Sequence, residues 1–189
     1  MSSSFVRILV AAAVVASCAA GFALGSINSG QDPSAAKLSP EQQHLKQHAG
    51  VWDANLKITG EPGGEPMTMK GTMTGTLICN GAWLVEEFKS DTFQGHGITG
   101  YDPHKKKYVN VWVDSESPSF QMGEGTGSAD GKTITMMVEG ADASGKIVKT
   151  REVTEMKGEQ SRTFTIYEIG ADGKEKVGLT IDYTRRAAR

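Results

Sequence analysis

Turn-forming residues recur about every 14 residues over the second half of this chain. Three of these turns share a pattern of alanine, aspartate or serine, glycine and lysine, and the Asp-Gly or Ser-Gly step supplies the positive φ that a tight hairpin turn needs. The turn signals lie at Pro103, Ser117-Pro118, Gly131, Gly145, Gly158-Glu159 and Gly173. The intervals suit strands of roughly eight to ten residues. The spacing therefore predicts an antiparallel meander without helical crossovers.

We expect about ten strands between Trp52 and Arg185. A meander of this length either exposes two unpaired edges or closes on itself, and closure removes the edges. The predicted fold class is therefore all-β, an antiparallel up-and-down β-barrel of about ten strands that follows a short N-terminal helix. A barrel with this many strands is wide enough to enclose a small-ligand cavity.

The elements before the regular turns fit this scheme. Ser39-Pro40-Glu41-Gln42 has the pattern of a helix N-terminus, which predicts a short helix that continues to about His48 and ends at Gly50. The most regular strand pattern is MTMKGTMTGTLIC, whose apolar face carries Met67, Met69, Met73, Leu77 and Cys79. We interpret this face as core, with Cys79 buried, and Asn80-Gly81 as the hairpin turn that follows.

The segment from Gly95 to Asp114 is typical of a hairpin with its turn at Asp102-Pro103. On its second strand, Tyr108, Asn110, Trp112 and Asp114 share one face, and three valines share the other. The mixed aromatic and polar face suits a cavity wall and the valine face suits packing. The pattern leaves open which of the two points inward.

The N-terminus carries an apolar segment, from Phe5 to Leu24, with one early positive charge at Arg7. Val15-Ala16-Ser17-Cys18 is similar to a bacterial lipobox, in which Cys18 would carry a lipid. Three interpretations stay open: a lipoprotein signal, an ordinary cleaved signal and an uncleaved anchor. All of them predict localisation in the cell envelope, periplasmic or secreted, with membrane attachment through this segment in two of the three.

The predicted domain organisation is a signal or anchor segment over residues 1–25, a flexible tether over residues 26–40 and one β-barrel domain over residues 41–189. After the first 31 residues the chain has 19 basic and 22 acidic side chains. This balance argues against nucleic acid as a partner. Since Cys18 lies in the N-terminal segment, we expect no structural disulfide with Cys79.

No familiar catalytic motif is present in the sequence: G-x-S-x-G, a phosphate loop, H-E-x-x-H and C-x-x-C are all missing. His44 and His48 share a helix face but have no third ligand of the right type nearby, so we predict no metal site and no cofactor. His104 belongs to a solvated turn. His96, between two glycines at the start of a strand, is a candidate for the mouth of a cavity.

Carboxylates within strands are the more informative polar residues. Glu86 and Glu87 are consecutive, so one of them must face the barrel interior. An interior carboxylate needs a partner, and Arg151 and Arg162 on later strands are the candidates. Such a pair is either structural or holds a polar group of a ligand.

Aromatic residues on strands supply the apolar part of a predicted pocket. The complete set of candidate ligand-binding residues is Trp52, Trp83, Glu86, His96, Tyr101, Trp112, Phe120, Arg151, Tyr167 and Tyr183.

Four segments resemble the bacterial family catalogued as domain of unknown function 1579: HAGVWDANL (48–56), GHGITGYDPHKKKYVNVWVDS (95–115), Gly123-Glu124-Gly125 and TIDYTR (180–185). The likeness extends from about Leu45 to Arg186. The family has no established activity, so the resemblance implies no catalytic residue.

Gly50-Val51-Trp52 after a short helix is also similar to the G-x-W that opens calycin barrels, namely lipocalins, fatty-acid-binding proteins and nitrobindins. That resemblance implies a calycin-like fold in which the tryptophan closes one end. Nitrobindin-like barrels bind haem through a histidine late in the chain, and here no histidine follows His104. Haem ligation therefore does not carry over.

The leading hypothesis is a secreted or membrane-tethered barrel that binds a small, partly apolar molecule in its interior without catalysis. A second hypothesis is an enzyme on the same barrel, with interior Glu86 or Glu87 as acid or base near His96. A third is a structural envelope protein that meets a partner through its outer surface, which a large exposed apolar patch would favour.

Overall fold

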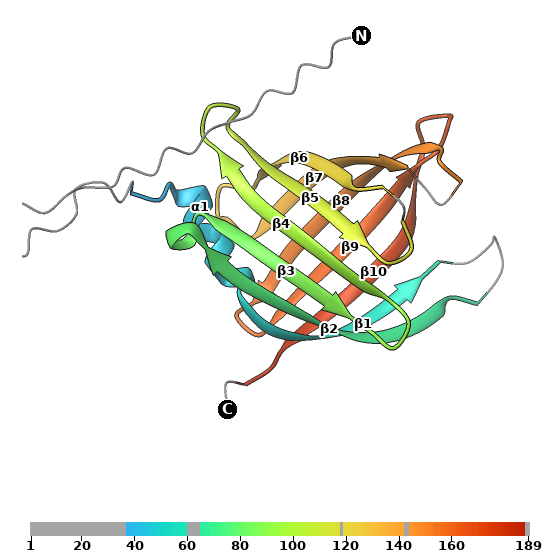
Figure 1. Ribbon diagram of the computed structural model, residues 1–189, viewed down its shortest axis with the longest axis horizontal. Helices are drawn as coiled ribbons and strands as arrows, with labels where there is room; N and C mark the ends of the chain where they lie inside the picture. Colours follow the sequence, from blue (N-terminus) through green and yellow to red (C-terminus); the bar gives the residue numbers. More distant parts are fainter. Residues whose placement is uncertain (1–36, 60–64, 118, 142–143, 188–189) are drawn as a thin grey trace, which may run out of the picture. The chain divides into compact units, whose positions relative to one another are not determined.

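The computed structural model describes residues 37–59, 65–117, 119–141 and 144–187, in which ten antiparallel strands form a barrel (Figure 1). The strands are β1 (Gly50–Ile58), β2 (Met67–Ile78), β3 (Trp83–Lys89), β4 (Gln94–Asp102), β5 (Lys107–Asp114), β6 (Gln121–Gly127), β7 (Thr133–Ala141), β8 (Ile147–Gly158), β9 (Ser161–Ile169) and β10 (Glu175–Arg185). Each strand pairs with the next, and β10 pairs with β1, from Trp52 opposite Arg185 to Ile58 opposite Leu179. The predicted closed barrel of about ten strands is confirmed.

The turns have the predicted chemistry. Gly131, Gly145 and Gly173 all adopt positive φ, at 68°, 84° and 76°. In the turn between β4 and β5, the Asp102 side chain accepts hydrogen bonds from the backbone N–H groups of His104 and Lys105, at 2.8 and 3.1 Å. These side-chain contacts fix the turn and hence the pairing of β4 with β5.

A short helical segment precedes the barrel, as predicted. α1 (Pro40–His44) begins with a capping box in which Ser39 and Gln42 exchange hydrogen bonds, and η1 (Leu45–His48) continues it as a 3₁₀ helix. Leu45 is fully buried among Leu84, Tyr108 and Ile134, so this segment packs into one end of the barrel. Within the residues described, no helix has the length and apolar character to cross a membrane.

Trp52 closes the same end, in agreement with the calycin resemblance. The Trp52 indole has no exposed surface and donates to the backbone oxygen of His48 at 3.0 Å. Arg185 lies over the ring, with its guanidinium carbon 3.9 Å from the centroid, and donates to the backbone oxygens of Gln47 and Ala49. These contacts join η1 to β1 and β10.

Strand alternation places most apolar side chains inside, in two clusters. One is Trp52, Ala54, Leu56, Met73, Phe88, Met156, Ile181 and Tyr183, and the other is Leu45, Leu84, Tyr108, Ile134, Met136 and Val138. On β5 the face with Tyr108, Asn110 and Trp112 points inward and the valine face points outward. The sequence pattern left undecided which face of β5 is interior, and the structure shows that it is the mixed aromatic and polar face.

The expectation that Cys79 is buried is wrong. β2 ends at Ile78, and Cys79 begins a one-turn 3₁₀ segment, η2 (Cys79–Gly81), in which Cys79, Asn80 and Gly81 all have positive φ. This turn interrupts the strand alternation, so the thiol is exposed. The hairpin between β2 and β3 is thus longer than a two-residue Asn-Gly turn.

The signal or anchor segment with Cys18, and most of the predicted tether, lie outside the described residues.

Candidate functional site

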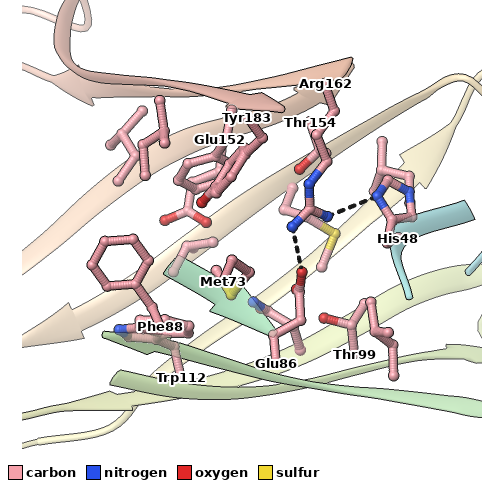
Figure 2. A pocket seen from close by; sticks show the side chains of 18 of the residues that line it. His48, Met73, Glu86, Phe88, Thr99, Trp112, Glu152, Thr154, Arg162 and Tyr183 are labelled. Carbon is pink, nitrogen blue, oxygen red and sulfur yellow. Dashed lines mark hydrogen bonds and ion pairs between the residues drawn. The ribbon is translucent and has the colours of Figure 1, made fainter. Parts of the chain in front are cut away.

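The barrel interior contains a cavity with a volume of about 270 Å³ (Figure 2). Both core clusters contribute to its wall, so it occupies the space between them. Its aromatic and aliphatic lining includes Leu45, Met73, Leu84, Phe88, Phe93, Trp112, Ile134, Met136, Val138, Phe164, Ile166, Leu179, Ile181 and Tyr183. Its polar lining is His48, Glu86, Thr99, Asn110, Asp114, Gln121, Glu152, Thr154 and Arg162.

One wall holds an ion pair between a buried arginine and a half-buried glutamate. Arg162, with 4% of its surface exposed, donates from Nη2 to Glu86 Oε1 at 2.9 Å and from Nη1 to His48 Nδ1 at 3.0 Å (Figure 2). Its guanidinium also lies over the rings of Trp52 and Tyr183, with centroid distances of 4.8 and 4.6 Å. The arginine charge is therefore compensated by a carboxylate, an imidazole and two aromatic faces.

This arrangement keeps His48 neutral. Burial, which has the largest effect, and the nearby charge of Arg162 together lower the pKa of His48 from 6.5 to about 3. Because a guanidinium can only donate, Nδ1 of His48 must be the acceptor, which leaves the imidazole proton on Nε2. Burial also raises the pKa of the Tyr183 hydroxyl, so it stays protonated at neutral pH.

Glu152 is the second interior carboxylate, and its surroundings differ. It lies on β8 opposite Met136 of β7 and Ile166 of β9, both apolar. Its one hydrogen bond in the described structure is from the Thr150 hydroxyl, at 3.3 Å. Burial raises the pKa of Glu152 from 4.5 to about 7, which the Thr150 contact only partly opposes.

Trp112 forms part of the cavity wall because two glycines of β4 leave space for its ring. A methyl group at Gly95 would overlap the Trp112 ring, and one at Gly97 would lie 2.8 Å from it. The indole therefore lies flat against the β4 backbone and donates to Asp114 Oδ2 at 3.0 Å. This explains the Gly-His-Gly sequence at residues 95–97.

The structure brings several predicted site residues together. Glu86, Trp112 and Tyr183 line the cavity, and Arg162 is the partner that Glu86 was expected to need. Trp52 and Tyr101 are interior but do not contribute to the cavity wall: Trp52 lies under Arg162, and Tyr101 packs edge-on against Tyr108, with 5.3 Å between ring centroids.

Other predicted site residues lie on the outer face, and placing them at an interior site was wrong. Strand alternation turns Trp83 outward because its neighbour Leu84 points in. Tyr167 and Arg151 are paired outside: Arg151 lies over the Tyr167 ring at 3.9 Å and binds Glu175 at 2.6 Å. Phe120 precedes β6 and is 59% exposed.

The predicted acid and imidazole pair is also outside the barrel. His96 points outward since both flanking glycines face Trp112. Its Nε2 lies 3.9 Å from Glu87 Oε1, and both side chains are substantially exposed. Glu87 instead binds Lys89 at 2.6 Å, which lowers its pKa. An interior pair of Glu86 or Glu87 with His96 does not exist.

Sequence reasoning missed Glu152 and His48. The sequence does contain a signal for Glu152. Glu152, Thr154 and Met156 alternate with Arg151 and Val153 along one strand, so they share a face, and the apolar Met156 indicates that this face is the interior one. His48 enters the interior because η1 turns it away from His44, which contacts Gly131 instead. The described residues contain no cluster of three His, Cys, Asp or Glu side chains that could hold a metal ion.

Comparisons with known proteins agree with this architecture. The sequence model for "Protein of unknown function (DUF1579)" matches residues 37–185, which contain the whole barrel and its helix. The chain belongs to the DUF1579 family. The predicted family is thus confirmed, and no curated protein matches this DUF1579 chain.

Two solved structures share the barrel fold of this DUF1579 protein. The crystal structure of Rv2717c from M. tuberculosis has 12% identity and a TM-score of 0.59, over 80% of this chain and 100% of that one. The S-type phycobiliprotein lyase CPES from Guillardia theta has 11% identity and a TM-score of 0.52, over 78% and 93%. At these identities the likeness concerns the fold alone.

Proposed function

We propose that this DUF1579 barrel binds a small, partly apolar molecule in its interior. The observation that carries the proposal is the cavity of about 270 Å³, which is lined by large apolar side chains and a few convergent polar groups. A mostly apolar wall with a few polar groups is the usual composition of a small-molecule site. Phe88, Trp112 and Phe164 would contact the apolar part of such a molecule.

We propose binding without catalysis because Glu86, the interior acid of the enzyme alternative, is already paired with Arg162. Glu86 accepts a hydrogen bond from Arg162, and His48 accepts another through Nδ1. Glu86 is therefore not a free acid or base for a bound molecule. The enzyme alternative required His96 in the same pocket, and His96 lies outside.

The test is a titration with N-phenyl-1-naphthylamine, a neutral apolar dye whose fluorescence rises when it leaves water. We expect saturable enhancement with one dye bound per chain. Thr154→Phe should abolish it, because Thr154 lines the cavity and a phenyl ring would occupy that space (Figure 2).

Val153→Phe is the matched control. Val153 is the next residue of β8 and points to the outside, so the same ring leaves the cavity open. Equal dye binding by the two phenylalanine variants, both folded by circular dichroism, would place the dye elsewhere and contradict the proposal.

We propose further that the barrel acts in the cell envelope, attached or exported through the apolar segment at residues 5–24. Metabolic labelling with a fatty-acid probe, with Cys18→Ser as the comparison, separates the three interpretations of that segment. Lipidation predicts label that the variant loses. A shortened, unlabelled chain indicates a cleaved signal, and an unlabelled full-length membrane chain indicates an anchor. A full-length unlabelled chain in the cytoplasm contradicts the proposal.

The third alternative, a structural protein that meets a partner through its outer surface, stays a prediction. Met122 and Met137 are exposed on the outer wall of β6 and β7, beside the charged side chains of Glu124 and Glu139.

A further inference from the structure

We propose that the cavity selects a molecule with a basic nitrogen, which binds the Glu152 carboxylate as an ammonium group. This inference rests on the proposed interior binding and names the chemical class of the ligand.

Glu152 is an interior carboxylate without a cationic partner among the described residues. Its only polar contact there is the neutral hydroxyl of Thr150 at 3.3 Å, and its cross-strand neighbours are Met136 and Ile166. A partly buried carboxylate in an apolar interior with so little compensation is costly for the protein alone. A ligand that supplies a donor or a positive charge would remove that cost.

Arg162 does not neutralise Glu152. In the register of β8 with β9, Arg162 lies opposite Met156, four residues beyond Glu152. At about 3.3 Å per residue this separates their backbone positions by roughly 13 Å along the strand. In Figure 2 the dashed lines join Arg162 to Glu86 and His48, and Glu152 stands outside this network.

The other interior carboxylates already have partners. Glu86 binds Arg162. Asp114 accepts the Trp112 N–H at one oxygen and the backbone N–H groups of Glu116 and Ser117 at the other. Glu152 is therefore the interior carboxylate with which a basic nitrogen of a ligand would form the most favourable new contact.

The charges along the wall favour a cation over an anion. Three carboxyl groups, Glu86, Asp114 and Glu152, and one permanent cation, Arg162, line the cavity, while His48 is neutral and Tyr183 is protonated. A ligand carboxylate would be repelled by the unpaired carboxyl group of Glu152, whereas an ammonium group would form an ion pair with it. An apolar molecule with a terminal amine fits both the charge and the aromatic lining.

The experiment compares three compounds with the same skeleton: 4-phenylbutylamine, 4-phenylbutan-1-ol and 4-phenylbutanoic acid. Each is titrated at pH 8 against the bound N-phenyl-1-naphthylamine. We expect the amine to displace the dye at a concentration about tenfold or more below that of the acid, which corresponds to one charge pair in a buried site. The alcohol should lie between them.

Glu152→Gln removes the charge and keeps the shape, so the amine should lose its advantage over the alcohol. Glu155→Gln is the matched control, because Glu155 lies on the outer face of β8 and binds Lys157 there. It should leave the preference unchanged. For the wild type, the affinity for the amine should also rise between pH 5.5 and pH 8, as Glu152 ionises with its pKa of about 7.

The outcomes separate the two proposals. Suppose that the dye binds in the cavity. If the acid then competes as well as the amine, or if none of the three compounds competes, the inference about the ligand class is wrong, while the proposal of interior binding stands. Retention of the amine preference in Glu152→Gln also overturns it. If the dye does not bind the wild-type barrel at all, the proposed function fails and this inference fails with it.

Discussion

The Nη1 atom of Arg162 lies 3.0 Å from the Nδ1 atom of His48, in the wall of the cavity. An arginine cannot accept a hydrogen bond, so this contact requires an unprotonated Nδ1 on the imidazole. His48 is thereby held neutral beside a permanent cation, whereas Glu152 in the same interior is stabilised in its protonated form by burial. The two groups give the barrel opposite responses to pH.

The first prediction concerns this opposition. For His48 the folded pKa of about 3 is below the unfolded value of 6.5, so its contribution to stability is complete above pH 6.5 and is lost as the pH falls. For Glu152 the folded pKa of about 7 is above the unfolded value of 4.5, so its contribution is complete below pH 4.5 and is lost as the pH rises. Between pH 4.5 and 6.5 the two slopes cancel.

Single substitutions should reveal how each of the two groups makes the free energy of unfolding depend on pH. Relative to wild type, the free energy of unfolding of His48→Gln should fall with rising pH in this window, and that of Glu152→Gln should rise, each by at most about 1.4 kcal/mol per pH unit. Urea unfolding at several pH values measures this. Parallel curves for His48→Gln and wild type would show that the buried imidazole does not titrate as described.

A second prediction separates the interior ion pair from an exterior one. Arg162→Met should cost about 3–5 kcal/mol in the free energy of unfolding, because it leaves Glu86 half-buried without its partner and removes the cation from beneath Tyr183. Arg151→Met, which breaks the outer pair with Glu175, should cost about 1 kcal/mol or less. Chemical denaturation of both variants provides the comparison. Similar losses would mean that Arg162 is not the organising charge of the interior.

A third prediction concerns the backbone beneath Trp112. Gly95→Ala should displace the indole, because the added methyl group overlaps the ring, and should destabilise the barrel by about 1–3 kcal/mol through overpacking. The tryptophan emission spectrum should shift as the Trp112 ring moves. Gly158→Ala is the control, since a methyl group there meets nothing within 4 Å. An unchanged spectrum in Gly95→Ala would contradict the proposed fit of Trp112 against β4.

The sequence predicted the barrel well because turns and alternation are local properties. The regular glycine turns, the capping box at Ser39 and the G-x-W at Trp52 each fix local geometry, and together they leave few alternatives to a closed meander. Cys79 was misplaced because a single turn of 3₁₀ helix ends the alternation one residue before it. A change of that kind depends on the backbone conformation of three residues with positive φ, which an alternating pattern does not reveal.

The candidate site was predictable only in part. The rule that one of Glu86 and Glu87 points inward is geometric, and Arg162 follows as a partner of opposite charge. Aromatic residues, by contrast, occur on both faces of this barrel, so Trp83 and Tyr167 could not be told from Trp112 and Tyr183 by residue type. Which face is interior depends on the register between strands, and a tertiary contact such as Trp112 against Gly95 decides it.

The central claim, that the interior holds a small molecule, is tested most directly by native mass spectrometry of the barrel purified without detergent from its own cells. The account predicts one small molecule that stays with the wild-type chain and with Val153→Phe, leaves on denaturation, and is missing from Thr154→Phe. A chain that carries no molecule in any of the three forms, or the same molecule in Thr154→Phe, would contradict it.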